Sequence, residues 1–143
     1  MRQNEKDLLL KDLCGRLPYG VKVKFGDSKP ALLTVIEHDE FGWQIGSEDE
    51  FGGMITIIDN VKPYLFPLSS MTEEQWMDTP YANLNKFTFD SFKCGCSTLA
   101  FETYEVNLSY VVEFINWCYK NHFDIYGLIP MGLAIDATGL NIY

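Results

Sequence analysis

The segment YGVKVKF, residues 19–25, decides the fold class because its side chains alternate between apolar and polar. Apolar residues fall on one side of an extended chain and lysines on the other: Val21, Val23 and Phe25 against Lys22 and Lys24. This period of two predicts a half-buried strand with one wet face, which is typical of antiparallel sheets. The turn-forming residues GDSKP follow directly, so we expect the chain to reverse and pair with itself.

Four further strand-like runs follow this segment. ALLTVIEH, WQIG, GMITII and VKPYLF bring the set to five short strands between residues 20 and 66. Short strands with tight turns predict a small bent antiparallel sheet or half-open barrel, of which an SH3-like barrel is one form. Because Pro63 has no N–H to donate, we expect the last strand to lie on an edge or to carry a bulge.

Helical patterns flank the strands on both sides. A first helix is predicted over residues 3–14, with Gly15 at its left-handed cap. Thr72 and Gln75 form a capping box that opens a short helix. A longer helix is predicted over residues 107–121, with Asn107 as its N-cap. Its predicted apolar stripe comprises Leu108, Val111, Val112, Ile115, Cys118, Tyr119 and His122.

A second short helix is predicted over residues 124–136, within DIYGLIPMGLAID. Residues 78–106 hold two strand-like runs, NKFTFDSF and STLAFETYEV, with KCGC at a hairpin turn between them. The expected fold is therefore a single α+β domain over residues 1–143. Its small sheet would be packed by an N-terminal helix and a C-terminal helix pair.

The charge is unevenly distributed, with a net value of −9. Residues 1–29 carry seven basic and four acidic side chains, whereas residues 30–61 carry seven acidic side chains and no Lys or Arg. Binding to nucleic acid or to anionic membranes requires a cationic surface. We therefore expect no direct contact with nucleic acid and no attachment to a membrane.

The cellular compartment is indicated by two features. The opening residues MRQNEKDLLLKDLCGRL contain only three consecutive leucines, which is too short an apolar run for a signal peptide. No apolar run reaches the roughly 20 residues that a membrane helix needs. The four cysteines are then expected to be free thiols, and the protein is expected in the cytoplasm.

Three blocks of the chain carry a resemblance: KDLCGRLPYGVKV, VKPYLFPLSSMTEEQ and NHFDIYGLIPMGLAIDAT. They resemble an uncharacterised family of small proteins from gut anaerobic bacteria and their prophages or mobile elements. The resemblance implies an origin in such elements and no known activity. It does not extend to residues 78–106.

A structural zinc site is the sharpest chemical hypothesis. Cys118 and His122 are four residues apart and would project from one face of a helix. With Cys94 and Cys96 they would complete four ligands of the kinds that zinc prefers. We favour the alternative, because a spacing of one residue between cysteines is unusual for zinc sites. Cys118 would then be a small core residue and His122 a helix-end cap, and no cofactor is expected.

A small enzyme with a Cys–His site is a further alternative. Cys14 or Cys94 can be paired with His38 or His122, but no flanking signature supports any such pair. GDSKP lacks the glycines of a phosphate-binding loop, and FGG is not a dinucleotide-binding motif. No catalytic residue is therefore assigned.

The stretch EHDEFGWQIGSEDEFGG, residues 37–53, is the best candidate for a binding surface, because aromatic residues beside charges are common at recognition sites. The candidate protein-binding residues are Phe41, Trp43, Glu48, Asp49, Glu50 and Phe51. The alternative is that Trp43 and one phenylalanine are core residues and that the acidic side chains keep the loops soluble. We therefore predict a non-enzymatic cytoplasmic protein-interaction module that binds an unidentified protein, as an accessory protein of a mobile element. An acidic inhibitor that mimics nucleic acid, a small enzyme and a zinc-stabilised domain remain alternatives.

Overall fold

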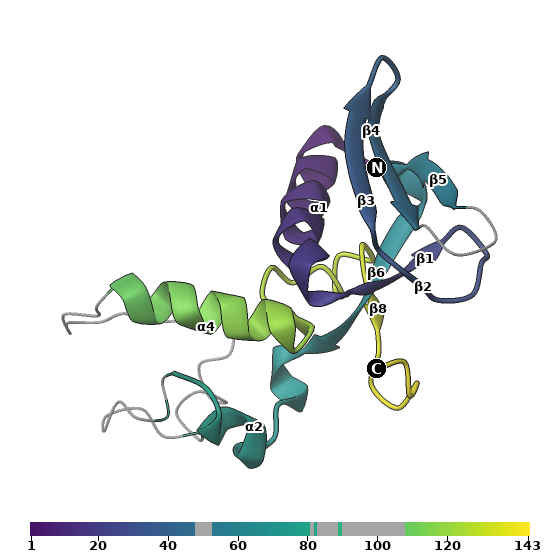
Figure 1. The fold of residues 1–143 in the computed structure, drawn as a ribbon. Coiled ribbons are helices and arrows are strands. Elements are labelled where there is room, and N and C mark those ends of the chain that lie inside the picture. Colours follow the sequence, from purple (N-terminus) through teal and green to yellow (C-terminus); the bar gives the residue numbers. More distant parts are fainter. Residues whose placement is uncertain (48–52, 81, 83–88, 90–107) are drawn as a thin grey trace.

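The computed structural model describes residues 1–47, 53–80, 82, 89 and 108–143. The chain has an α+β fold, with an N-terminal helix, two small sheets and a C-terminal helix, as the sequence predicted (Figure 1). The helices are α1 (Gln3–Arg16), α2 (Glu73–Met77) and α4 (Leu108–Lys120), with short 3-10 turns at η1 (Leu17–Tyr19), η2 (Ile58–Asn60) and η3 (Leu68–Ser70). The strands are β1 (Lys22–Phe25), β2 (Ala31–Leu32), β3 (Val35–Asp39), β4 (Gly42–Ser47), β5 (Met54–Ile57), β6 (Val61–Pro67), β7 (Phe123–Asp124) and β8 (Ile135–Asp136).

The described strands form two sheets. One sheet is mixed and runs β2-β1-β6-β7, with β8 also pairing with β6, whereas the other is antiparallel and runs β3-β4-β5. The predicted strand over residues 31–38 is divided between them, since β2 belongs to the first sheet and β3 to the second. The SH3-like form stays a prediction.

The strand β6 is internal to its sheet, which corrects the prediction that Pro63 would put it on an edge or at a bulge. It pairs with β1 in antiparallel orientation, and with β7 and β8 in parallel orientation. The register with β1 runs without interruption from Val61 to Pro63. Pro63 lies one residue before the pairing with β8 begins at Tyr64. Its missing N–H is therefore not required by that ladder.

Alternation along the first strand places its apolar side chains in the main core. Val21 and Val23 are fully buried and Phe25 nearly so, while Lys22 and Lys24 remain partly exposed. Leu9 and Leu13 of α1 cover this core, and Leu65 and Leu128 close it. Burial of these branched side chains is the main force that holds α1 against the sheets.

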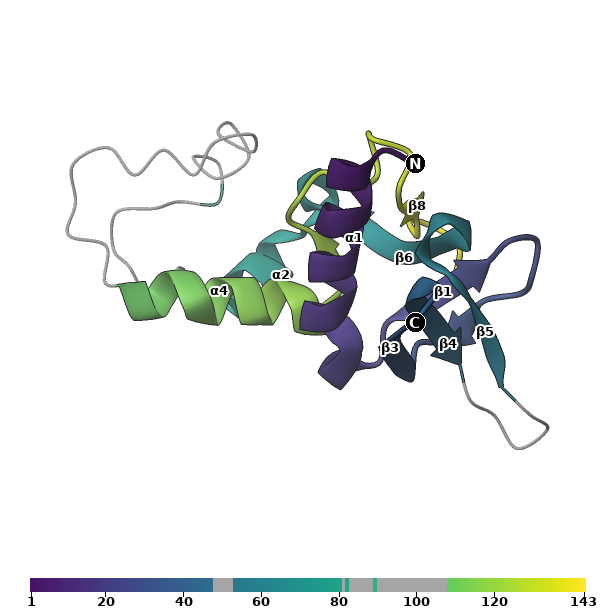
Figure 2. The ribbon, with the colours of Figure 1, turned by 90° about the horizontal axis from the view of Figure 1, so that it is seen from above.

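A second core lies between α2 and α4. Met71, Trp76, Phe114, Cys118 and Phe123 form this cluster. Figures 1 and 2 both show α4 extending away from the sheets, and α2 lies beside it. The predicted capping box opens α2, because the Thr72 hydroxyl accepts a bond from the Gln75 N–H and the Gln75 side chain accepts one from the Thr72 N–H.

Gly15 does not cap α1, contrary to the prediction, and the helix continues to Arg16. The left-handed conformation occurs instead at Gly20, after the short turn η1. Gly15 lies under the ring of Tyr119, which leaves no space for a side chain at that position. The glycine therefore permits close packing of α1 on α4 and does not end the helix.

The predicted second helix over residues 124–136 is wrong. Two short strands, β7 and β8, flank a series of turns in this segment. The buried carboxylate of Asp124 accepts bonds from the Leu128 and Ile129 N–H groups, both at 2.9 Å. Gly127 and Gly132 adopt positive φ angles of 70° and 73°, which a helix does not permit.

The apolar stripe of α4 is confirmed in part. Cys118 and Tyr119 are buried, but Val112 is 51% exposed and Phe114, which the predicted stripe omitted, is buried. Phe114, and not Val112, is buried because α4 packs against the aromatic cluster around Trp76, of which Phe114 is a member. The predicted cap Asn107 and the predicted strands over residues 85–92 and 97–106 lie outside the described residues, apart from Phe89.

None of the helices in the described part of the chain is both long and apolar enough to cross a membrane.

Candidate protein-binding cleft

The turn between β3 and β4 presents an aromatic side chain to solvent. The Asp39 carboxylate accepts a bond from the Phe41 N–H at 2.8 Å, and Gly42 supplies the positive φ angle of 110° that the turn requires. This local bond needs no tertiary partner, so the turn is determined by its own residues. Phe41, at the tip of the hairpin, is 77% exposed.

Trp43 lies next to this turn, on the sheet face that leads into the core. Trp43 is opposite His38 in the β3–β4 register, and the two rings are perpendicular, with centroids 5.0 Å apart. Ile45, two residues further along β4, is fully buried on the same face. Trp43 is on the same face as this core residue but is 41% exposed, so it lies where the core meets solvent.

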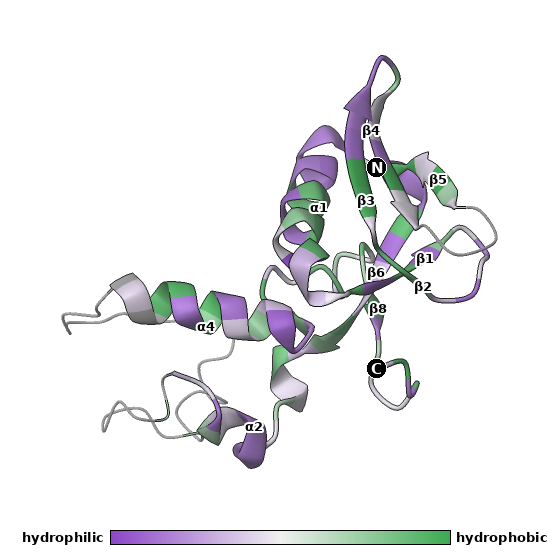
Figure 3. Cartoon of the chain, viewed as in Figure 1, coloured by the Kyte–Doolittle hydropathy of each residue, from purple (hydrophilic) through white to green (hydrophobic). Residues whose placement is uncertain are grey.

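A cleft of about 420 Å³ separates this hairpin from the N-terminal half of α1. Its size lies within the range of small-ligand and side-chain pockets. The residues that line it are Gln3, Lys6, Asp7 and Leu10 from α1, His38, Phe41, Gly42 and Trp43 from the hairpin, and Ile57, Ile58 and Asp59. In Figure 1, α1 stands beside the β3–β4 hairpin, and Figure 3 shows that the hairpin becomes hydrophilic toward its turn.

The charges at the base of this cleft are partly paired. Lys6 Nζ lies 2.5 Å from Asp59 Oδ2, and the Met1 amine lies 3.4 Å from Asp59 Oδ1. The hydrogen bond from Lys6 lowers the pKa of Asp59 below its usual range, so this carboxylate is ionised at neutral pH. Asp7 accepts a bond at 2.7 Å from the neutral amide of Gln3.

The structure brings two of the predicted binding residues, Phe41 and Trp43, into this single cleft. The other four, Glu48, Asp49, Glu50 and Phe51, lie outside the described residues. Sequence reasoning missed His38 and the contribution of α1. A helical spacing does place Gln3, Lys6, Asp7 and Leu10 on one face, but nothing local indicates that this face borders a hairpin over thirty residues later.

The outer face of the three-stranded sheet is a second exposed apolar surface. Ile55 and Ile57 on β5 are 54% and 45% exposed. Gly46 separates Ile55 from Val35 on this face, with little space above it. The apolar segment YLFP, residues 64–67, by contrast belongs to β6, where Leu65 is fully buried.

The two predicted zinc ligands that the structure describes occupy different surroundings. Cys118 lies within the aromatic cluster, where burial raises the pKa of its thiol to about 12. The ring of His122 stacks on Tyr143, with centroids 3.8 Å apart, and burial lowers its pKa to about 4. Cys94 and Cys96 lie outside the described residues, and the described ranges hold no cluster of three or more His, Cys, Asp or Glu side chains suited to a metal ion.

A buried ion pair that sequence reasoning did not anticipate joins α1 to the C-terminal segment. Arg16 donates to both carboxylate oxygens of Asp12, at 2.7 and 2.9 Å, and to the Phe123 carbonyl at 2.7 Å. Both charged side chains are fully buried, and the Arg16 guanidinium lies over the Tyr119 ring at 5.0 Å. The i, i+4 spacing of Asp12 and Arg16 was visible in the sequence, but it usually marks a solvent-exposed pair.

Comparison with known proteins gives no family for this chain. No protein-family model matches it, and neither the curated proteins nor the solved structures contain a match. The resemblance to small proteins of gut anaerobes and their mobile elements therefore rests on the three sequence blocks alone.

Proposed function

We propose that this protein is a non-enzymatic protein-interaction module and that the cleft between α1 and the β3–β4 hairpin is its binding surface. One observation carries the proposal: the exposed rings of Trp43 and Phe41 line one cleft together with charged side chains. Exposed aromatic side chains at the edge of a core are the usual anchors of protein interfaces. The three sequence blocks support a role as an accessory protein of a mobile element.

The proposed site of action is the cytoplasm. Cys14 is exposed and Cys118 is buried, and both are free thiols. An exposed free thiol is compatible with a reducing compartment, where disulfides do not persist. The partner would be a protein of the host or of the element itself.

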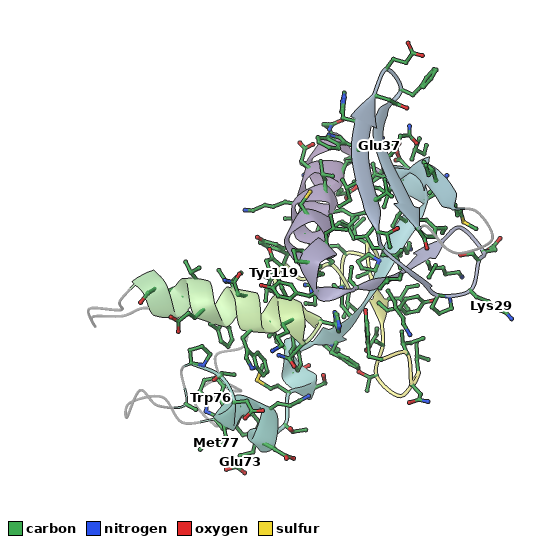
Figure 4. The ribbon with its side chains drawn as sticks, viewed as in Figure 1. Lys29, Glu37, Glu73, Trp76, Met77 and Tyr119 are labelled. Carbon is green, nitrogen blue, oxygen red and sulfur yellow. The ribbon has the colours of Figure 1, made fainter. Side chains whose placement is uncertain are left out.

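Site-directed photo-cross-linking tests the proposal. A photoreactive phenylalanine analogue is placed at Phe41, or at Met77 as the control, and the full-length protein is irradiated in extracts of its host. Met77 is a matched control because it is 63% exposed and lies on α2, far from the hairpin (Figure 4). Cross-linked peptides are then identified by mass spectrometry.

We expect a specific protein adduct from position 41, none from position 77, and loss of the adduct when Trp43→Leu is added. Thermal unfolding of each variant checks that the fold is retained. An adduct that forms equally from both positions, or that survives Trp43→Leu in a folded protein, would overturn the assignment of this surface.

A further inference from the structure

We infer that the cleft binds an arginine side chain, presented by a basic segment of the partner protein. The inference rests on the proposed function and adds the chemistry of the ligand. Three observations carry it: an exposed tryptophan that lines the cleft, a carboxylate whose partner among the described residues is a neutral amide, and a hairpin whose sequence contains no Lys or Arg.

The aromatic part of the site is Trp43. The rings of His38 and Trp43 meet at 78°, and Trp43, which lines the cleft, remains 41% exposed. Trp is the aromatic residue that attracts cations most strongly, because its ring face carries the largest negative potential. Phe41 adds apolar surface along which the methylene stem of a long side chain can lie.

The anionic part of the site is Asp7. Its carboxylate lines the cleft, and its described partner is the neutral amide of Gln3. Asp59, by contrast, already has Lys6 and the Met1 amine as cationic partners. Asp7 therefore remains free to accept charge-assisted hydrogen bonds from a ligand.

The surrounding charge has the same sign. Asp39 and Glu40 flank the tip of the hairpin, and residues 30–61 contain no Lys or Arg. On the α1 side, Lys6 is paired with Asp59 and Arg2 with Glu5. Lys11, one turn after Asp7, lies over the Tyr126 ring at 5.2 Å. The amino end of α1 adds a partial positive charge, but only over its first turn. The field at the mouth of the cleft therefore attracts a cationic partner and repels an anionic one.

Arginine fits these groups better than lysine does. Its planar guanidinium can stack on the Trp43 ring while its edge donates two parallel hydrogen bonds to the Asp7 carboxylate. A lysine ammonium is a compact and strongly hydrated charge, so it gains less from an open indole face.

Titration of the ¹⁵N-labelled full-length protein with short peptides tests this inference. The probe is an end-blocked Gly-Ser-Arg-Ser-Gly peptide, compared with peptides that carry lysine or the neutral arginine isostere citrulline at the centre. We expect saturable shifts at the Trp43 indole N–H and at residues 38–43, with a Kd in the millimolar range that rises with salt. The indole of Trp117 on α4 serves as an internal control.

The expected order of affinity is arginine, then lysine, with no saturable binding of the citrulline peptide. Trp43→Leu should weaken arginine binding at least about threefold, and Asp7→Asn about twofold to fivefold. Glu113→Gln, an exposed carboxylate on α4, should leave binding unchanged.

Equal binding of the arginine and citrulline peptides, or shifts of Trp117 in place of Trp43, would overturn the inference. If the cross-link from position 41 forms but the arginine peptide does not bind, the arginine inference is wrong and the proposed function stands. If the peptide binds the cleft but no protein adduct forms at position 41, the proposed function fails and the affinity of the cleft for arginine stands.

Discussion

The ring of Tyr119 lies directly on Gly15, so that a Cβ at position 15 would be 2.5 Å from the ring carbons. This contact joins α1 to α4, and Tyr119 is only 7% exposed. The Tyr119 hydroxyl also contacts that of Tyr126 at 3.3 Å. The ring is therefore held on several sides and has little freedom to move away.

Gly15→Ala should lower the free energy of unfolding by about 1–2 kcal/mol, even though alanine favours helices. The overlap with Tyr119 outweighs the gain in helix propensity. Urea unfolding measures the change. In a Tyr119→Leu background, which removes the ring, the same substitution should be neutral or stabilising. A stabilising effect in the wild-type background would contradict the packing described for this contact.

Breaking the buried ion pair should be costly. Asp12→Leu leaves the Arg16 guanidinium buried without its carboxylate, and we expect a loss of about 3–5 kcal/mol. Asp7→Leu, the same change at an exposed position of α1, should alter stability by less than about 0.5 kcal/mol. The double variant Asp12→Leu and Arg16→Met should recover most of the loss, because no charge then remains unpaired. A loss below about 1 kcal/mol for Asp12→Leu would show that water reaches this pair.

His122 should make stability depend on pH in a defined window. Burial, with a smaller contribution from Arg16, lowers its folded-state pKa to about 4, whereas an unfolded histidine titrates near 6.5. Between these values the unfolded chain binds more protons, so stability is full above about pH 6.5 and is lost as the pH falls to about 4. Because the ring is partly exposed, we expect a loss of roughly 1–2 kcal/mol across this window.

The control for this prediction is His122→Asn, because asparagine tolerates the positive φ angle of 60° found at this position. Chemical unfolding at several pH values should show a flatter profile for the variant between pH 6.5 and about 4. A profile identical to that of the wild type would assign the pH dependence to other groups.

The two described thiols should differ in reactivity. Burial raises the pKa of Cys118 to about 12, and Cys14 is exposed although its pKa is also raised. A maleimide added to the native protein should label Cys14 well before Cys118, and peptide mapping by mass spectrometry distinguishes them. Cys118 should react at the rate of Cys14 only in denaturant. Early labelling of Cys118 would indicate that the cluster around Trp76 opens readily.

The sequence predicted those elements whose signals are local. Alternation over residues 19–25 identified β1, and leucine spacing identified α1, because each pattern matches the period of its own backbone. The Thr72–Gln75 capping box marked the start of α2, since both of its hydrogen bonds lie within four residues. Acidic and turn residues around Phe41 and Trp43 made these two aromatic residues candidates for a surface, but the structure was needed to show that both are exposed.

The tertiary structure decided what depends on distant partners. Gly15 is a packing site because the Tyr119 ring lies on it. Arg16 can be buried because the Asp12 carboxylate and the Phe123 carbonyl accept hydrogen bonds from its guanidinium. The segment from Phe123 to Asp136 forms short strands and turns, and not a helix, because both of its strands pair with the backbone of β6.

The sequence by itself determined a strand-rich α+β chain with an acidic, aromatic hairpin. Only the tertiary structure placed α1 opposite that hairpin and so formed a cleft. The physical reason is that a periodic pattern indicates which face of a helix or strand is apolar, but it does not indicate which other element will cover that face.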